Sequence, residues 1–261
     1  MIRIGLCSGA LLALGTDEII KAAKDAGLDA IEWSADAHIR PGDARVAVET
    51  MMATLRAGLT LSSYASIYRA GSDDEGLGRF QALLDTASAM YAPNLRIFAP
   101  TKAAGQKLAV AGLAGELRRL GDKAAVRGVT VCMSLGRNTW LDDYPAALAL
   151  VARAAHPFVR LAWEDLPASS GEEASVALEK AGADVALVIA RCVDRAGRAI
   201  GIAGSDDEWR RRMAAFKRSE RDPKMGSFAL IGSAQDAEAL AVEARALRSL
   251  VKEIEAPRPK P

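Results

Sequence analysis

Eight short apolar segments alternate with longer amphipathic segments along this sequence, and this alternation constrains the fold more than any other feature. Continuous apolar runs of this length are typical of parallel strands that are buried on both faces. Right-handed crossovers connect such strands, and eight of them can close into a barrel. The predicted strands are Ile2–Cys7, Leu28–Trp33, Leu59–Ala65, Asn94–Ala99, Val129–Leu135, Val159–Glu164, Asp184–Arg191 and Ser227–Ser233.

The segments between these strands have the periodicity and the end signals of helices. In the first segment, Thr16 is predicted to cap a helix that begins with Asp17 and Glu18, which favour the positive end of the helix dipole. The other predicted helices are Arg45–Arg56, Leu77–Met90, Leu108–Arg127, Pro145–Ala155, Glu172–Lys180, Asp207–Lys217 and Ala234–Ile254.

A glycine stands between helix and strand at four junctions, namely Gly27, Gly58, Gly128 and Gly182. Each is placed where a helix would end in a left-handed residue. A doubly wound open sheet is the alternative fold, but no Gly-x-Gly-x-x-Gly motif follows the first predicted strand. We therefore predict an α/β fold, a single (β/α)8 TIM barrel over residues 1–255, followed by a flexible Pro-rich tail over residues 256–261.

The composition excludes several classes of partner. The chain has 261 residues with 34 basic and 33 acidic side chains, a balance that does not indicate a nucleic-acid or anionic-membrane partner. Neither a signal peptide nor an apolar run of the ~20 residues that span a bilayer is visible, so we expect a cytoplasmic protein. The widely spaced cysteines Cys7, Cys132 and Cys192 are expected to be reduced thiols.

Site residues of such a barrel are expected at the carboxyl ends of its strands. Glu32 ends the second strand and His38 follows six residues later, so the two could act as base and substrate binder or as metal ligands. Desolvation is expected to raise the pKa of Glu32 and make it a base near neutral pH. Glu164 and Asp165 follow the sixth strand and, being adjacent, should point to opposite faces. The candidate catalytic residues are Glu32, His38 and Glu164.

Further polar and aromatic side chains near the predicted rim are candidates for substrate contacts. Trp163 could form an apolar wall for a sugar ring, whereas alternation should turn Trp33 toward the flanking helices. Arg191, Arg195 and Arg198 follow the seventh strand, where barrels often bind phosphate, and they raise the alternative of an anionic substrate. The candidate substrate-binding residues are Cys7, Trp33, Tyr64, Tyr68, Arg69, Asn138, Trp163 and Arg191, and no cofactor is predicted.

Motifs in the first third of the chain resemble those of the xylose-isomerase-like superfamily, which includes sugar phosphate isomerases and epimerases. Gly27–Trp33 looks like the Gly-hydrophobic-Asp-Gly-hydrophobic-Glu strand of that group, and Asp36–Asp43 looks like its His-Pro-Pro-Gly-Asp loop. Leu61–Tyr64 is also similar. The order of elements agrees over nearly the whole chain, so the resemblance implies a TIM barrel and a small-molecule substrate, and it leaves a homodimer open.

The sequence departs from this resemblance at the metal ligands. Active members of the superfamily hold a divalent metal through side chains at the ends of strands five to eight. Here Ser134 stands where the resemblance implies a Glu, the seventh strand has no His, and Gly232 replaces a second Glu. One or two remaining carboxylates cannot fill the coordination shell of a divalent ion. We therefore predict no metal at the rim; the alternative is a displaced site built from Glu32, His38 and Glu164.

The function predicted on this basis is an isomerase or epimerase that transfers protons on a small carbonyl or sugar-like substrate without the metal. Glu32 is the predicted base, and His38, Arg69 or Arg191 would stabilise the developing oxyanion. A metal-independent lyase or cyclase on the same barrel is one alternative, and a non-catalytic small-molecule-binding pseudo-enzyme is another. An abasic-site nuclease is disfavoured, because it would need several metals and a basic face.

Overall fold

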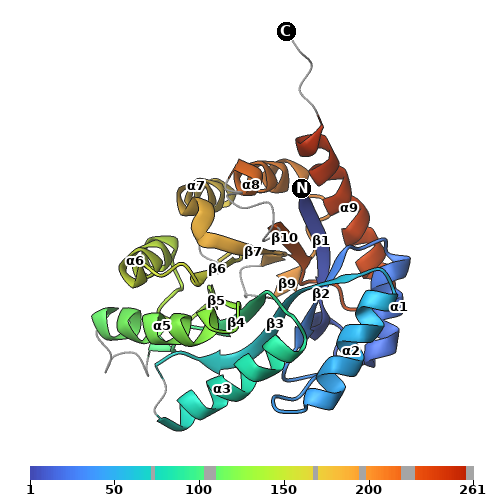
Figure 1. Cartoon of the computed structure of the whole chain (residues 1–261). Coiled ribbons are helices and arrows are strands. Elements are labelled where there is room, and N and C mark those ends of the chain that lie inside the picture. The colour runs from blue at the N-terminus through green and yellow to red at the C-terminus, as the bar shows by residue number, and fades with distance from the viewer. Residues whose placement is uncertain (72–73, 103–109, 167–169, 194–197, 219–226, 257–261) are drawn as a thin grey trace.

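The computed structural model describes residues 1–71, 74–102, 110–166, 170–193, 198–218 and 227–256. Eight parallel strands form a closed barrel in the order β1-β10-β7-β6-β5-β4-β3-β2, surrounded by helices, which confirms the predicted TIM barrel (Figure 1). The barrel strands are β1 (Ile2–Cys7), β2 (Ala30–Ser34), β3 (Thr60–Arg69), β4 (Asn94–Phe98), β5 (Thr130–Ser134), β6 (Val159–Trp163), β7 (Val185–Ala190) and β10 (Ser227–Ile231).

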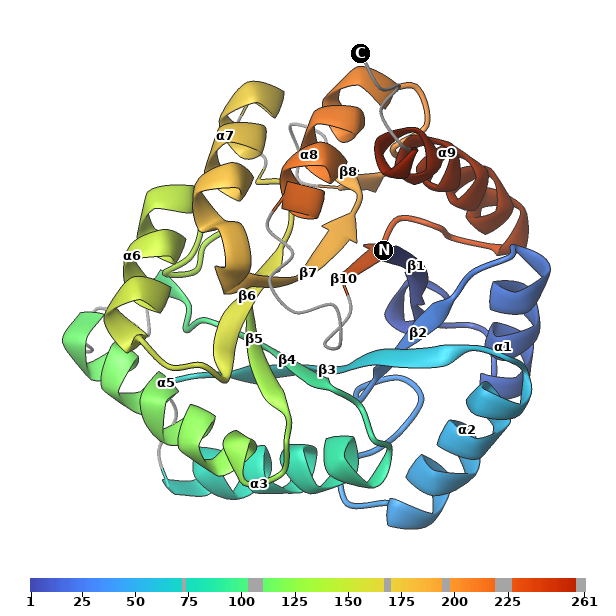
Figure 2. The same ribbon diagram turned by 45° about the horizontal axis from the view of Figure 1, so that its top comes forward.

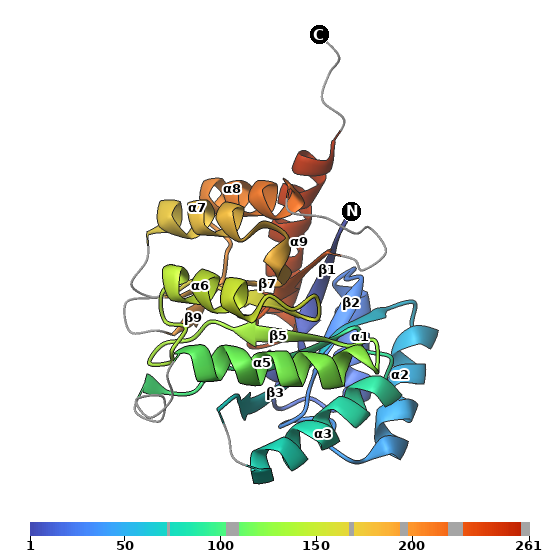
Figure 3. The ribbon, with the colours of Figure 1, turned by 60° about the vertical axis from the view of Figure 1, so that its left-hand side comes forward.

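The helices form one outer layer around these strands. Figure 2 shows α9 beside α1, so the last helix contacts the first and completes the ring. In the side view of Figure 3, α5, α6 and α7 lie one above another on the outside of the strands. The helices are α1 (Thr16–Asp25), α2 (Ala44–Arg56), α3 (Asp74–Ala89), α5 (Val110–Ala125), α6 (Tyr144–Ala154), α7 (Gly171–Ala181), α8 (Asp206–Arg218) and α9 (Ala237–Glu255). None of the described helices has the length and apolar composition needed to cross a bilayer.

Small elements complete the fold and were not predicted. A two-stranded antiparallel hairpin, β8 (Cys192–Val193) with β9 (Ala199–Ile200), follows β7, and 3-10 turns occupy Ser8–Ala10 and Gly182–Asp184. Two-residue strands are too short to produce a periodic signal in the sequence. The predicted Pro-rich tail beyond residue 256 lies outside the described residues.

The ends of the helices correct one prediction and agree with another. Thr16 is the first helical residue, and the cap is Gly15, whose N–H donates to the Glu18 carboxylate at 2.8 Å. The four junction glycines all have positive φ, with values of +68°, +82°, +66° and +52° in chain order, which favours glycine at each. Gly182 departs from the predicted left-handed helix end, because its ψ is −127°.

Strand side chains divide between the barrel interior and the layer under the helices. Small and apolar side chains, among them Cys7, Ala30, Cys132 and Leu230, form a cluster of their own that is separate from the larger core beneath the helices. This division follows the alternation of side chains along each strand. Every barrel strand has at least one buried apolar side chain, as shown by Ile4, Ile31, Leu61, Ile97, Val131, Leu161, Val188 and Leu230.

Candidate functional site

A buried ion pair between Glu32 of β2 and Arg96 of β4 lies inside the barrel. Arg96 Nη2 donates to Glu32 Oε1 at 2.7 Å and Arg96 Nε donates to Oε2 at 2.9 Å. Glu32 Oε2 also accepts from the Ser63 hydroxyl at 2.7 Å, and Arg96 Nη1 donates to Ser134 Oγ at 3.1 Å. The two side chains are 2% and 16% exposed. This two-point arrangement is the strong geometry of arginine–carboxylate pairs.

The electrostatics of Glu32 are opposite to the sequence prediction. Burial alone would raise the pKa of Glu32, but the Arg96 charge and the hydrogen bonds from Arg96 and Ser63 outweigh burial and lower it. The prediction of a raised pKa is therefore wrong, because it counted desolvation without the cation that the barrel brings to Glu32. A carboxylate with a lowered pKa and both oxygens bonded is a poor general base.

A second ion pair joins the ends of β6 and β7. Arg191 Nη2 donates to Glu164 Oε2, and the two side chains are 33% and 4% exposed. The adjacent Asp165 instead pairs with Arg212 of α8 at 2.9 Å, in the helix layer. Glu164 and Asp165 thus point in different directions, as their adjacency on the chain predicts. Of these two adjacent carboxylates, Glu164 is the one whose cation lies at the barrel's carboxyl end.

Cys7 and Arg191 both lie beside Gly232, which directly follows β10. A Cβ atom at Gly232 would lie 2.8 Å from Ile189 Cγ2, 3.7 Å from Arg191 Cδ and 3.9 Å from Cys7 Sγ. Burial, reinforced by the Glu32 charge, raises the pKa of Cys7 well above its ordinary value. Cys7 is therefore a neutral thiol at the barrel's carboxyl end and not an activated nucleophile.

His38 is not brought to Glu32. The Ser8 hydroxyl lies 3.1 Å from His38 Nδ1, and the His38 ring meets Trp33 edge to face with centroids 6.0 Å apart. Within the described part of the chain, no hydrogen bond joins His38 to Glu32. Burial lowers the pKa of His38, although nearby backbone carbonyls act in the opposite direction. The described contacts thus join His38 to Ser8 and Trp33, and not to Glu32, the residue that the sequence suggested as its catalytic partner.

Three aromatic candidates face the helices. Trp33 Nε1 donates to Thr54 of α2 at 3.2 Å, and the Tyr64 hydroxyl donates to a backbone carbonyl of the β2–α2 connection at 2.6 Å. Trp163 stacks on Tyr144 of α6 with ring centroids 4.4 Å apart. Trp163 therefore packs under the helices and does not form an apolar wall inside the barrel, because it is on the outward face of β6.

The remaining substrate-binding candidates lie at the end of β3 and after β5, and Arg69 approaches the Glu32–Arg96 pair because both arginines lie over the Phe98 ring, at 5.5 and 5.8 Å from its centroid. Tyr68 packs on Phe80 at 5.6 Å, and Arg69 donates to the Ala99 carbonyl at 2.9 Å. Tyr68 and Arg69 line a surface cleft of about 680 Å³ beside α3. Asn138 is exposed and adopts a positive φ of 59°. Arg195 and its neighbour Asp194 lie outside the described residues.

Arg96 is the functional candidate that sequence reasoning missed, together with its partner Ser63. No site residue was expected on the fourth strand. A signal was present, because Arg96 lies between Leu95 and Ile97, which both face the helices. Alternation places an arginine between two such residues inside the barrel, where a charge needs a partner.

The residues present do not fit the divalent metal of the resembling family. The Arg96 guanidinium lies between Glu32 and Ser134, and the Ser134 hydroxyl accepts a hydrogen bond from it. Gly232 has no side chain that could ligate a metal. Among the described residues, no group of three His, Cys, Asp or Glu side chains is arranged to hold a metal, the proposed trio of Glu32, His38 and Glu164 included.

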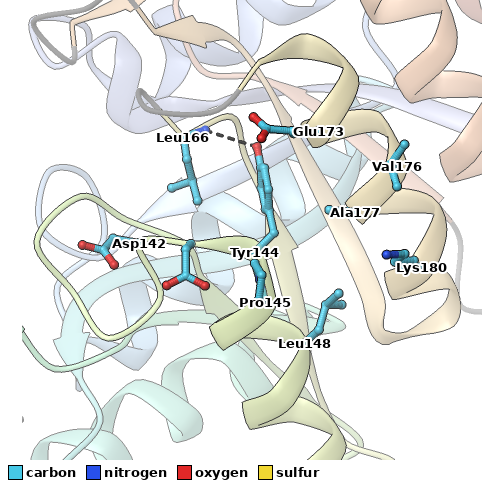
Figure 4. Close-up of a pocket in the computed structure, with 10 residues that line it drawn as sticks. Asp142, Tyr144, Pro145, Leu148, Leu166, Glu173, Val176, Ala177 and Lys180 are labelled. Carbon is cyan, nitrogen blue, oxygen red and sulfur yellow. Dashed lines mark hydrogen bonds between the residues drawn. The ribbon is translucent and has the colours of Figure 1, made fainter.

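A cavity of about 360 Å³ lies outside the barrel, between α6 and α7 (Figure 4). Figure 4 shows Tyr144 pointing toward Leu166, whose N–H donates to the Tyr144 hydroxyl at 3.3 Å. Val176 and Lys180 border the other side from α7. None of the site residues predicted from the sequence lines this cavity.

Asp165 should make stability depend on pH. Burial raises the pKa of Asp165 from its ordinary value of 3.8 to about 6, because the Arg212 charge offsets only part of the desolvation. An acid whose folded pKa is raised stabilises the fold fully below its unfolded pKa, and this contribution is lost as the pH rises through about 6. We expect the free energy of unfolding, measured in urea, to fall between pH 4 and pH 6 relative to Asp165→Asn. An equal pH dependence of unfolding in the two proteins would contradict the raised pKa. Asp17→Asn removes an exposed carboxylate and is the control, which should keep the pH dependence of the wild type.

Comparisons with known proteins support the fold. No family model and no curated protein matches the sequence. Among solved structures, the probable 3-DHS dehydratase AsbF from Bacillus anthracis is similar, with a TM-score of 0.73 and 13% identity over 95% of this chain and 99% of that one. A D-allulose 3-epimerase from Methylomonas sp. has a TM-score of 0.69 and 15% identity over 97% and 98%. A xylose isomerase-like protein from Mycobacterium smegmatis, in complex with magnesium, has a TM-score of 0.69 and 15% identity over 98% of both chains. This chain therefore has the fold of xylose isomerase-like TIM barrel proteins, which it matches over nearly its whole length at low sequence identity.

Proposed function

We propose that this barrel transfers protons on a small carbonyl or sugar-like compound, as an isomerase or epimerase, without a divalent metal. The observation that supports this is the Arg96 guanidinium, held by Glu32 and Ser134 inside the barrel. Removing a proton beside a carbonyl develops negative charge on the carbonyl oxygen. A fixed guanidinium in a poorly solvated site can stabilise that charge, as a metal does elsewhere.

In this proposal Glu164 replaces Glu32 as the group that carries the proton. Both oxygens of Glu32 accept from Arg96, whereas Glu164 is bonded to Arg191 through one oxygen, Oε2. Glu32 then has a positioning role, because it fixes the plane of the Arg96 guanidinium. Glu164 is oriented by Arg191 in the same way, and its second oxygen is left for a substrate C–H or O–H group.

The test is exchange of substrate protons with D2O, followed by NMR on fructose and fructose 6-phosphate with EDTA present. The wild-type chain is expected to exchange the protons beside the carbonyl, and Glu164→Gln is expected to lower the rate by about 100-fold or more. Glu49→Gln on the exposed face of α2 is the matched control and should keep the full rate. Exchange that is absent in the wild type, or equal in Glu164→Gln, would reject the proposal.

Two alternatives are separated by the same experiment. A lyase acting at the same carboxylate would eliminate water and form a new unsaturated product, which the NMR spectra would show. A non-catalytic binder is favoured by one observation, namely that both carboxylates at this end of the barrel are held in ion pairs. Binding of a ligand without exchange of protons on either sugar would identify the protein as a non-catalytic binder.

A further inference from the structure

Arg191 has a buried donor with no acceptor. Its Nη2 donates to Glu164, but its Nε is buried and has no hydrogen-bond partner. Leaving a buried donor unsatisfied destabilises the fold, so such a group calls for an explanation. The side chain as a whole is 33% exposed, so the guanidinium that carries the buried Nε also borders solvent.

Arg96 also carries N–H groups that no acceptor among the described residues uses. A guanidinium carries five N–H groups. Glu32 accepts two of those of Arg96 and Ser134 accepts one. The rest meet no acceptor among the described residues, and the side chain is 16% exposed. Two guanidinium groups at this end of the barrel therefore keep donors that the protein itself does not use.

Arg191 and Cys7 both border Gly232. Arg191 Cδ and Cys7 Sγ lie 3.7 Å and 3.9 Å from the point that a Cβ of Gly232 would occupy. Cys7 lies opposite Glu32, the partner of Arg96, in the register of β1 and β2, and both guanidinium charges act to lower the pKa of the buried thiol. Gly232 adds no side chain that would stand between Arg191 and Cys7.

We propose that the barrel mouth binds a small oxyanion, the carboxylate or phosphate group of a ligand, whose oxygens accept from Arg191 Nε next to Cys7. Arg96 supplies the second positive group. This deepens the proposed function by making its substrate anionic, and it rests on the same site. Glu32 and Glu164 neutralise the charges of Arg96 and Arg191, so net charge does not select the ligand. The unused N–H donors of the two guanidinium groups do, and such directed donors favour oxyanions over halides.

The experiment is calorimetric titration with pyruvate and with inorganic phosphate, in chloride buffer with EDTA. We expect one site per chain for at least one of the two, and the tighter ligand identifies carboxylate or phosphate as the preferred group. Hydroxyacetone, which has the size of pyruvate but no charge, should not bind. Failure of both anions to bind at millimolar concentration would overturn the inference.

Substitutions of Arg191 test whether the anion binds at this residue. Arg191→Lys keeps the charge but removes Nε, and it should weaken binding at least tenfold. Arg210→Lys, an exposed arginine of α8 that pairs with Glu253, is the matched control and should bind as the wild type does. If Arg191→Lys does not fold, the double variant Glu164→Gln/Arg191→Gln removes both charges together and should also lose binding. Unchanged affinity in the folded variant would overturn the assignment.

This outcome is independent of turnover. Anion binding without proton exchange would keep the oxyanion site and reject the proposed function. Exchange on neutral fructose without binding of either anion would keep the proposed function and reject the oxyanion site.

Discussion

Replacing Glu32 by glutamine is expected to destabilise the fold by about 3 kcal/mol, because it leaves the Arg96 charge buried without its counter-ion. Arg96 donates to both Glu32 oxygens, and its side chain is only 16% exposed. Glutamine can accept one of these hydrogen bonds but carries no charge. Since the pKa of Glu32 is lowered in the folded state, this stabilisation is present at neutral pH and is lost only as the pH falls through the lowered value.

Urea unfolding at pH 7 measures this effect, and two variants make it specific. Glu49→Gln breaks an exposed pair with Arg45, so it should change stability by no more than about 0.5 kcal/mol. Glu32→Gln/Arg96→Met removes both charges and should recover part of the loss, because no unpaired charge remains buried. A Glu32→Gln protein as stable as the wild type would show that the buried pair does not contribute to the fold.

The fold could be predicted because its signals are local. Each strand is an apolar run, each helix has its own periodicity, and Gly27 or Gly58 marks a helix end within a few residues of the strand that follows. Eight such units leave few ways to arrange the chain. The hairpin that begins at Cys192–Val193 was not predicted, because its strands are too short to show a hydrophobic period.

The site could be predicted only in part because its partners are distant in sequence. Glu32 and Glu164 were placed at the ends of the correct strands, but the cations that pair with them were not identified. Glu32 and Arg96 are 64 residues apart on strands that are not neighbours, since β3 lies between β2 and β4. Their pairing depends on the placement of β3 between the two strands and on a register shift beside Glu32 that sets Ser63 against it. Without that cation, desolvation was the only visible influence on the carboxylate, and the predicted pKa shift had the wrong sign.

Replacing Gly5 by alanine is expected to be the next most damaging change, at about 2 kcal/mol. Gly5 pairs with Ala30 of β2 and Leu230 of β10. A Cβ there would lie 2.7 Å from Leu230 Cδ2 and 2.8 Å from the Ala30 carbonyl oxygen. The leucine end can rotate, but the carbonyl belongs to a barrel strand and cannot move without the sheet.

The matched control is the same substitution at Gly115, in the middle of α5, where a Cβ would meet no atom within 4 Å. Gly115→Ala should stabilise the protein by about 0.5–1 kcal/mol, since alanine loses less backbone entropy in a helix than glycine does. Urea unfolding of both variants should therefore show shifts of opposite sign. A Gly5→Ala protein that is as stable as the wild type, or more stable, would mean that β1 does not approach its neighbours so closely. Because Cys7 follows Gly5 by two residues on the same face, a displaced β1 would also move the thiol. Pyruvate binding should then weaken in Gly5→Ala and stay unchanged in Gly115→Ala.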